Sequence, residues 1–206
     1  MSEYDWEPVR GLPGHLPAGE HILWQGAPDW RVLLRSAFHG KLIAIYFALL
    51  ATAGLVTGNL VGAGVTVGAG LLCIAVLALL AWSSARTTVY TLTNKRLVLR
   101  IGVALPKCFN LPLKLVQAAD LKPLGTGHAD IALTMAGETR LAYLLLWPHA
   151  RPWHLKHPRP MLRSVPEAEA VAAKLTRACA ALAPIELATE TRSAPVTAPM
   201  PAGLAA

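Results

Sequence analysis

Three histidines lie close together in the segment HARPWHLKHPRP, at His149, His154 and His157. Imidazole nitrogens are common zinc ligands, so a cluster of this kind could form a metal site. Prolines interrupt the spacing, however, and the segment contains no cysteine or acidic residue. We therefore predict no metal site here and expect a solvated basic segment near a membrane surface.

Other patterns that would support catalysis do not occur in the sequence. It contains no GxSxG, HExxH or Walker motif, and its acidic residues do not pair at a useful spacing. Asp120 and Asp130 are expected on or beside strands, where they end or cap them. We predict no catalytic residue, no cofactor and a protein that is not an enzyme.

Residues 42–82 form a run without Asp, Glu, Lys, Arg or His. As one helix, these 41 residues would be about 60 Å long, roughly twice the thickness of a bilayer core. The run therefore predicts two membrane spans, 42–58 and 64–82, that break at Gly58-Asn59. The alternative is a helical hairpin in a soluble core, although core helices of this length usually carry some charge. No histidine lies inside either span, so no haem or chlorophyll ligand is expected there.

The residues around this run indicate its orientation. Basic residues precede and follow it, and the short loop between the spans carries no charge. The positive-inside rule then places both termini in the cytoplasm and makes the chain a multi-pass membrane protein. Trp24, Trp30 and Trp82 flank the spans, as aromatic residues do at membrane interfaces.

Glycines recur within the run at a spacing of four residues. Gly54, Gly58 and Gly62 form one such series, and Gly64 and Gly68 form another. Glycines four apart on a membrane helix allow another helix to approach closely. The partner could be another subunit, a second copy in a homo-oligomer, or simply the other span.

Alternation with a period of two residues begins after the second span. In YTLTNKRLVLR, Leu97, Leu99 and Ile101 share one face of a strand, and Asn94 suits a hairpin turn. A short strand is expected within 20–30. Further strands are predicted at 107–111, 116–121, 131–135 and 140–146. A capping box at Ser164–Glu167 predicts an amphipathic helix that buries Val171, Leu175, Ala178 and Leu182 and ends at Pro184.

The predicted fold class is an α+β membrane protein. A two-helix transmembrane hairpin precedes a small antiparallel β-sheet or open barrel, which a C-terminal amphipathic helix caps. The predicted division is an N-terminal cytoplasmic arm at 1–41, the hairpin at 42–82, a cytoplasmic sheet domain at 86–184 and a disordered tail at 185–206.

The chain is basic, with a net charge of +7. An anionic inner leaflet accounts for this charge more simply than nucleic acid does, and no nucleic acid partner is predicted. Lys95, Arg96 and Arg100 are candidates for contact with lipid phosphates or a protein partner. The alternative is that these charges only signal topology and are otherwise solvated.

Two short motifs lie on either side of the hairpin. ExILWxGxP supplies Glu20, Trp24, Gly26 and Pro28, and YxLTNxR supplies Tyr90, Thr93, Asn94 and Arg96. In this order, they resemble the bacterial pleckstrin-homology (PH)-like membrane proteins. Longer blocks, among them LWPHARPW and GTGHADIALTMAG, resemble the photosynthetic complex assembly proteins of purple bacteria over roughly residues 14–183.

This resemblance implies an accessory protein of the bacterial inner (intracytoplasmic) membrane with a PH-like domain. Its partners would be membrane lipid, subunits of the reaction centre and core antenna, or other assembly factors. The resemblance implies no catalytic residues and no defined binding site. The alternative function is a general PH-like module that binds anionic lipid or a membrane protein at the membrane surface.

Overall fold

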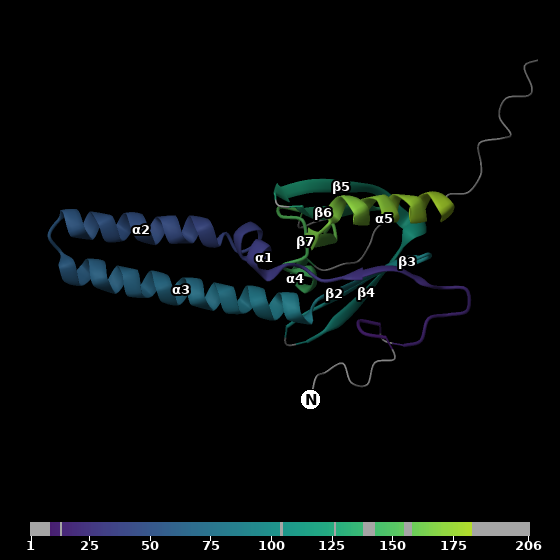
Figure 1. Cartoon of the computed structure of the whole chain (residues 1–206), viewed down its shortest axis with the longest axis horizontal. Helices are drawn as coiled ribbons and strands as arrows, with labels where there is room; N and C mark the ends of the chain where they lie inside the picture. Colours follow the sequence, from purple (N-terminus) through teal and green to yellow (C-terminus); the bar gives the residue numbers. More distant parts are fainter. Residues whose placement is uncertain are drawn as a thin grey trace, which may run out of the picture.

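The computed structural model describes residues 9–12, 14–103, 105–125, 127–137, 143–154 and 158–182. Two long antiparallel helices project from one end of a β-rich body (Figure 1). The short helix α1 (Trp30–Ser36) lies at the junction, and α5 (Ala168–Leu182) lies on the body and points away from the long helices (Figure 1). The tail predicted at 185–206 lies outside the described residues.

The projecting hairpin consists of α2 (Gly40–Val56) and α3 (Leu60–Thr87). The turn between them contains Gly58, whose φ of 75° is in the left-handed region that favours glycine. Asn59 then caps α3, because its side-chain oxygen accepts a hydrogen bond from the Gly62 N–H at 2.8 Å. The predicted helix break at Gly58-Asn59 is confirmed by these bounds.

Length and composition qualify α3 by itself as a membrane span. By contrast, α2 has 17 residues, and it reaches the length of a span only together with α1, from which it is bent by 60°. Within the described ranges, α3 is thus the one helix that qualifies unaided. The transmembrane hairpin of two spans therefore remains a prediction.

The hairpin is inserted into the sheet domain. Strand β1 (Ile22–Gly26) precedes it and pairs antiparallel with β2 (Val89–Thr93), which follows it. The expected short strand within 20–30 is confirmed. The residues assigned to a separate arm at 1–41 therefore include the first strand of the sheet, and the β-rich body extends across both ends of the hairpin.

Two antiparallel sheets form the β-rich body. The first has the order β1-β2-β3-β4, with β3 at Arg96–Ile101 and β4 at Lys107–Pro112. The short 3-10 helix η1 (Leu113–Leu115) leads into the second sheet, which has the order β5-β6-β7. Its strands are Val116–Gly125, His128–Met135 and Met161–Pro166. The strands predicted at 107–111, 116–121 and 131–135 are confirmed.

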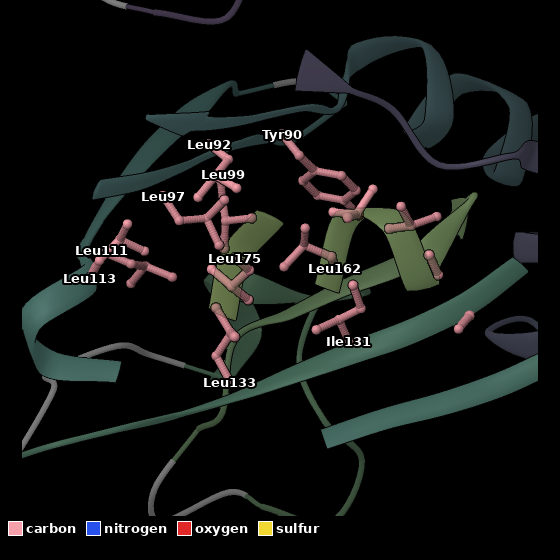
Figure 2. Packing of buried hydrophobic residues seen from close by; sticks show 14 of the residues in the cluster. Tyr90, Leu92, Leu97, Leu99, Leu111, Leu113, Ile131, Leu133, Leu162 and Leu175 are labelled. Carbon is pink, nitrogen blue, oxygen red and sulfur yellow. The ribbon is translucent and has the colours of Figure 1, made fainter. Parts of the chain in front are cut away.

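The core lies between the two sheets and beneath α5 (Figure 2). Leu99 from β3, Ile131 from β6 and Leu175 from α5 are all buried in it. On α5, Val171 and Ala178 are buried on the same face as Leu175, as the amphipathic pattern predicts. The C-terminal helix therefore closes the core.

The strand predicted at 140–146 is wrong. Tyr143–Leu146 forms the short helix α4, and residues 140–142 lie outside the described ranges. The segment is a short apolar run, and such a run does not distinguish strand from helix by its period.

The capping box predicted at Ser164–Glu167 is also wrong, because Met161–Pro166 forms β7 and α5 begins only at Ala168. The Ser164 N–H donates to Asp130 Oδ1 at 2.8 Å, and the Ser164 hydroxyl lies 3.2 Å from that of Ser36. Tertiary contacts with β6 and α1 thus outweigh the local helix-start signal.

Candidate functional site at the base of the hairpin

The two motifs that flank the hairpin meet in the folded protein. Arg96 Nε and the Thr93 hydroxyl each donate to Glu20 Oε1, both at 2.8 Å. The Asn94 side-chain oxygen accepts a hydrogen bond from the His21 N–H at 3.1 Å. Burial acts to raise the pKa of Glu20, but the hydrogen bonds from Arg96 and Thr93 together with nearby positive charge outweigh it, so that this pKa is lowered. These motif residues form a structural clasp.

The remaining residues of the first motif shape β1. Trp24 is half-buried and packs on the main core. A Cβ at Gly26 would overlap the Trp24 ring, so this position favours glycine. Pro28 is buried. Packing within the domain accounts for Trp24 in the motif without a membrane contact.

The basic face predicted at Lys95, Arg96 and Arg100 does not form. Arg100 is only 5% exposed, and Arg96 is held by Glu20. Lys95 is exposed, but it lies beyond the end of β2. This strand leads away from the hairpin for about 16 Å at ~3.3 Å per residue. The three side chains therefore do not present a common charge to a membrane that contains the hairpin.

Three of the five predicted glycines serve the hairpin itself. A Cβ on Gly54 would lie 3.2 Å from Ala63 Cβ, so Gly54 allows α2 to approach α3. Gly58 forms the turn, and a Cβ on Gly62 would collide with the capping side chain of Asn59. Contact between the two helices, rather than with a partner, explains Gly54.

Gly64 and Gly68 occupy a different position, on the outer surface of α3. Both are exposed, and an added Cβ at either would meet nothing within 4 Å. Of the five glycines, these two remain available to a partner.

His149 is buried in a polar network. Its Nδ1 lies 2.8 Å from the Tyr90 hydroxyl, and its Nε2 lies 3.2 Å from the Thr88 hydroxyl. The Arg163 N–H donates to the Tyr90 oxygen at 3.1 Å. Tyr90 is therefore placed to donate its own proton to Nδ1, which leaves the Nε2–H of His149 to donate to Thr88.

The solvated basic role expected for His149 is wrong. Burial, followed by the positive charge of Arg163, lowers the pKa of His149 to about 3. The imidazole is therefore neutral near pH 7 and holds the hydroxyl of Tyr90 on β2, which in turn accepts the Arg163 N–H of β7. His154 is half-buried in the following loop, and His157 lies outside the described residues.

Arg163 and Asp130 lie beside this network, on β7 and β6. Burial raises the pKa of Asp130 and lowers that of Arg163, while their opposite charges act against both shifts. Arg163 Nη2 donates to the Ala150 carbonyl at 3.3 Å, but its buried Nε has no hydrogen-bond partner among the described residues. A buried donor without a partner costs about 1–3 kcal/mol.

A cleft of about 460 Å³ is lined by Arg163. One wall comes from the base of the hairpin, with Ser36 and His39, and the other comes from the three-stranded sheet, with Lys122 and Asp130. Donor groups for an anion therefore converge where the hairpin joins the sheet domain.

Aromatic side chains surround the same junction. Phe38 is buried against α3 in a cluster with Leu33 and Ala81. Its ring makes an edge-to-face contact with Trp147, at 5.6 Å between centroids, and Trp147 is exposed. This contact places Trp147 beside the base of the hairpin.

Two of the three tryptophans predicted at a membrane interface, Trp30 and Trp82, lie in this region as well. The Arg86 guanidinium is 5.5 Å from the Trp82 ring on α3, and Trp82 is exposed. Trp30 begins α1, and the Arg31 guanidinium is 5.4 Å from its ring. Aromatic groups and cations thus occur together at the hairpin base.

Sequence analysis did not connect Arg163 with Lys122 or with the hairpin. The reason is that Arg163 lies on β7, which was not predicted, so its neighbours on the sheet could not be assigned. The chemistry of the cleft, which has hydroxyl, guanidinium and ammonium groups, suits binding of an anion.

Comparison with known proteins adds the family. Residues 44–178 match the family described as "Bacterial PH domain". The chain belongs to this bacterial PH domain family. It is also 39% identical over 189 residues to "Uncharacterized 23.7 kDa protein in puhA 5'region" of Rhodobacter capsulatus, which covers 87% of this chain and 88% of that protein. No solved structure matches the chain. The bacterial PH domain match begins inside α2, so the matched region includes most of the hairpin.

Proposed function

We propose that this bacterial PH domain protein is an inner-membrane assembly factor for the photosynthetic reaction centre and core light-harvesting complex. It would act by binding its partners and not by catalysis. The support is the sequence resemblance to assembly proteins, together with a relative from a purple bacterium that is named for its place in the puhA 5' region.

The observation that carries the membrane part of this proposal is the outer surface of the hairpin. Large apolar side chains such as Leu49, Val61 and Leu71 are exposed along both helices. Exposed apolar surface of this extent is unfavourable in water and marks contact with a membrane or another protein. Both helices would be buried in lipid.

The dimensions of the hairpin fit a bilayer. Helix α2 is about 25 Å long, and Trp82 lies about 33 Å along α3 from Leu60. The hydrocarbon core is about 30 Å thick. Trp82 and Trp147 would therefore lie at one interface, with the uncharged turn at Gly58 near the other.

The distribution of charged residues along the hairpin gives the proposed topology. Arg35, Lys41 and Arg86 lie at the base of the hairpin, and the turn carries no charge. The positive-inside rule places the base, the sheet domain and both termini in the cytoplasm.

The proposed mechanism is scaffolding. The outward surface at Gly64 and Gly68 would hold a helix of a nascent subunit, and the sheet domain would contact subunits or other assembly factors. A homo-oligomer that uses the same glycine surface is the competing arrangement.

The test is the near-infrared absorption spectrum of membranes from a strain that lacks the gene, beside its parent. Loss of the reaction-centre and core-antenna bands, with recovery when the gene is supplied in trans, is the expected result. An unchanged spectrum would overturn the assembly role and leave a general membrane-surface module as the function.

A further inference from the structure

We propose that the cleft between the hairpin base and the three-stranded sheet binds a phosphate group. The source is either the headgroup of an anionic phospholipid or a soluble phosphate compound. The lipid source rests on the membrane placement proposed above, whereas the phosphate site itself rests on the geometry of the cleft.

The first argument is Arg163. The residue is only 6% exposed, it lines the cleft, and its Nε has no hydrogen-bond partner among the described residues. Native proteins rarely leave a buried charged donor unpaired, and such a group commonly indicates a bound water or ion. The planar guanidinium suits the oxygens of a phosphate.

The second argument is the balance of charge within the cleft. Asp120 forms an ion pair with Arg151, and Asp130 Oδ1 accepts the Ser164 N–H at 2.8 Å. Both carboxylates are therefore engaged by protein groups. Asp130 keeps its charge beside Arg163 and Lys122, so the cationic side chains Lys122, Arg151 and Arg163 exceed the two carboxylates by one positive charge. This excess attracts an anion, and the cleft volume of about 460 Å³ exceeds the volume of a phosphate.

The third argument is position. Ser36 ends α1 and His39 directly precedes α2, so one wall of the cleft is the base of the hairpin. With the hairpin in a bilayer, this wall lies at the level where lipid phosphates lie. A headgroup could enter from the membrane while its acyl chains remain beside the exposed surface of α2.

The experiment uses the full chain purified in a nonionic detergent. Inorganic phosphate and glycerol 3-phosphate are titrated into it by calorimetry, and saturable binding is expected. Lys122→Gln and Arg163→Lys should each weaken binding by about tenfold or more, the usual effect of removing one charge-assisted hydrogen bond. Lys114→Gln is the matched control, because Lys114 is exposed and does not line the cleft.

A second arm distinguishes the two sources. The protein is exchanged into mixed micelles that contain phosphatidylglycerol or phosphatidylcholine, and bound lipid is counted by native mass spectrometry. Retention of one phosphatidylglycerol by the wild-type chain, with loss in Lys122→Gln, supports the lipid source. Phosphate binding without lipid retention supports the site and overturns the lipid source.

Two results would overturn the phosphate site itself. These are no saturable binding, or binding that Lys122→Gln and Lys114→Gln affect equally. Because Lys122 is exposed, its replacement tests the site without disturbing the core. The calorimetric arm needs no partner subunit, so its failure would leave the proposed assembly role untouched.

Discussion

Glu20 and Arg96 are 76 residues apart in the sequence, yet their side chains are joined by a 2.8 Å ion pair. The entire helical hairpin lies between them in the chain. The pair fastens the segment before β1 to the first residue of β3, at the end of the sheet that points away from the hairpin. The ion pair can therefore form only when the segments on either side of the hairpin have come together in the sheet.

Replacing Glu20 with Gln should lower the free energy of unfolding by about 1–3 kcal/mol, since Arg96 and Thr93 lose a charged acceptor. The Glu20 side chain is only 3% exposed, so solvent does not replace the lost contact. Chemical unfolding of the full chain in detergent measures the change. Lys95→Gln, at the exposed neighbouring position, should change stability by less than about 0.5 kcal/mol. Equal effects of the two variants would contradict the clasp.

The same pair has a pH dependence of known sign. Because the folded-state pKa of Glu20 is lowered from 4.5, its contribution is complete above pH 4.5 and is lost as the pH falls through the folded value. Glu20→Gln should therefore show a smaller loss of stability than the wild-type chain below pH 4.5. Unfolding midpoints measured from pH 6 to pH 3 test this difference.

His149 should make the domain sensitive to mild acid. Its pKa is 6.5 when unfolded and about 3 when folded, so the unfolded chain binds a proton first as the pH falls. Stability from this residue is complete above pH 6.5 and decreases by about 1.4 kcal/mol per pH unit below it. His149→Gln should be less stable at pH 7 but show a shallower decrease between pH 6 and pH 4. Identical slopes for the two proteins would disprove the buried neutral imidazole.

The hairpin glycines should separate into two classes on substitution. Gly54→Leu should destabilise the hairpin by about 1–3 kcal/mol, because the added side chain meets Ala63 on α3. Gly64→Leu and Gly68→Leu should leave stability nearly unchanged, because those positions are open. If the outer glycines bind a partner, these two variants will reduce the near-infrared absorption bands of the photosynthetic complexes while the protein itself remains stable. Normal bands in both would show that this surface is not the docking site.

Two native cysteines can test the membrane placement. Cys73 lies about 20 Å along α3 from its start, in the middle of the proposed span, while Cys108 is exposed on β4. A membrane-impermeant maleimide should label Cys108 in inverted vesicles and leave Cys73 unlabelled until detergent is added. Thr57→Cys should be labelled from the opposite side, in spheroplasts. Labelling of Cys73 in intact membranes would contradict the span.

The sequence predicted the elements with strong local signals. The charge-free run and Gly58-Asn59 located the hairpin break, and alternating leucines located β3. Local signals failed where tertiary contacts decide the structure. Ser164 resembles a helix cap, but its N–H donates to the Asp130 side chain on β6 and its carbonyl accepts the Asp29 N–H. The short apolar segment at 140–146 gave no reliable period.

The candidate site was less accessible to sequence analysis than the fold. Glu20 and Arg96 were found as motif letters, but their contact required the pairing of β1 with β2 across the hairpin. The basic residues near Asn94 were read as a surface, because alternation along β3 does not show that both of its faces are covered. His149 was read as solvated because its partners, Thr88 and Tyr90, lie about 60 residues earlier.

The insertion of the hairpin between β1 and β2 imposes an order on biosynthesis. The chain emerges from the ribosome with β1 first, so this strand has no partner until the polypeptide has passed through α2 and α3 and reached Val89. With the hairpin in a bilayer, as proposed, the two strands can pair only if both ends of the hairpin are on the same side. A molecule whose second helix failed to return would leave β1 and β2 on opposite sides, with no sheet to close. In the proposed membrane topology, completion of the sheet domain would thus serve as a checkpoint for correct membrane threading.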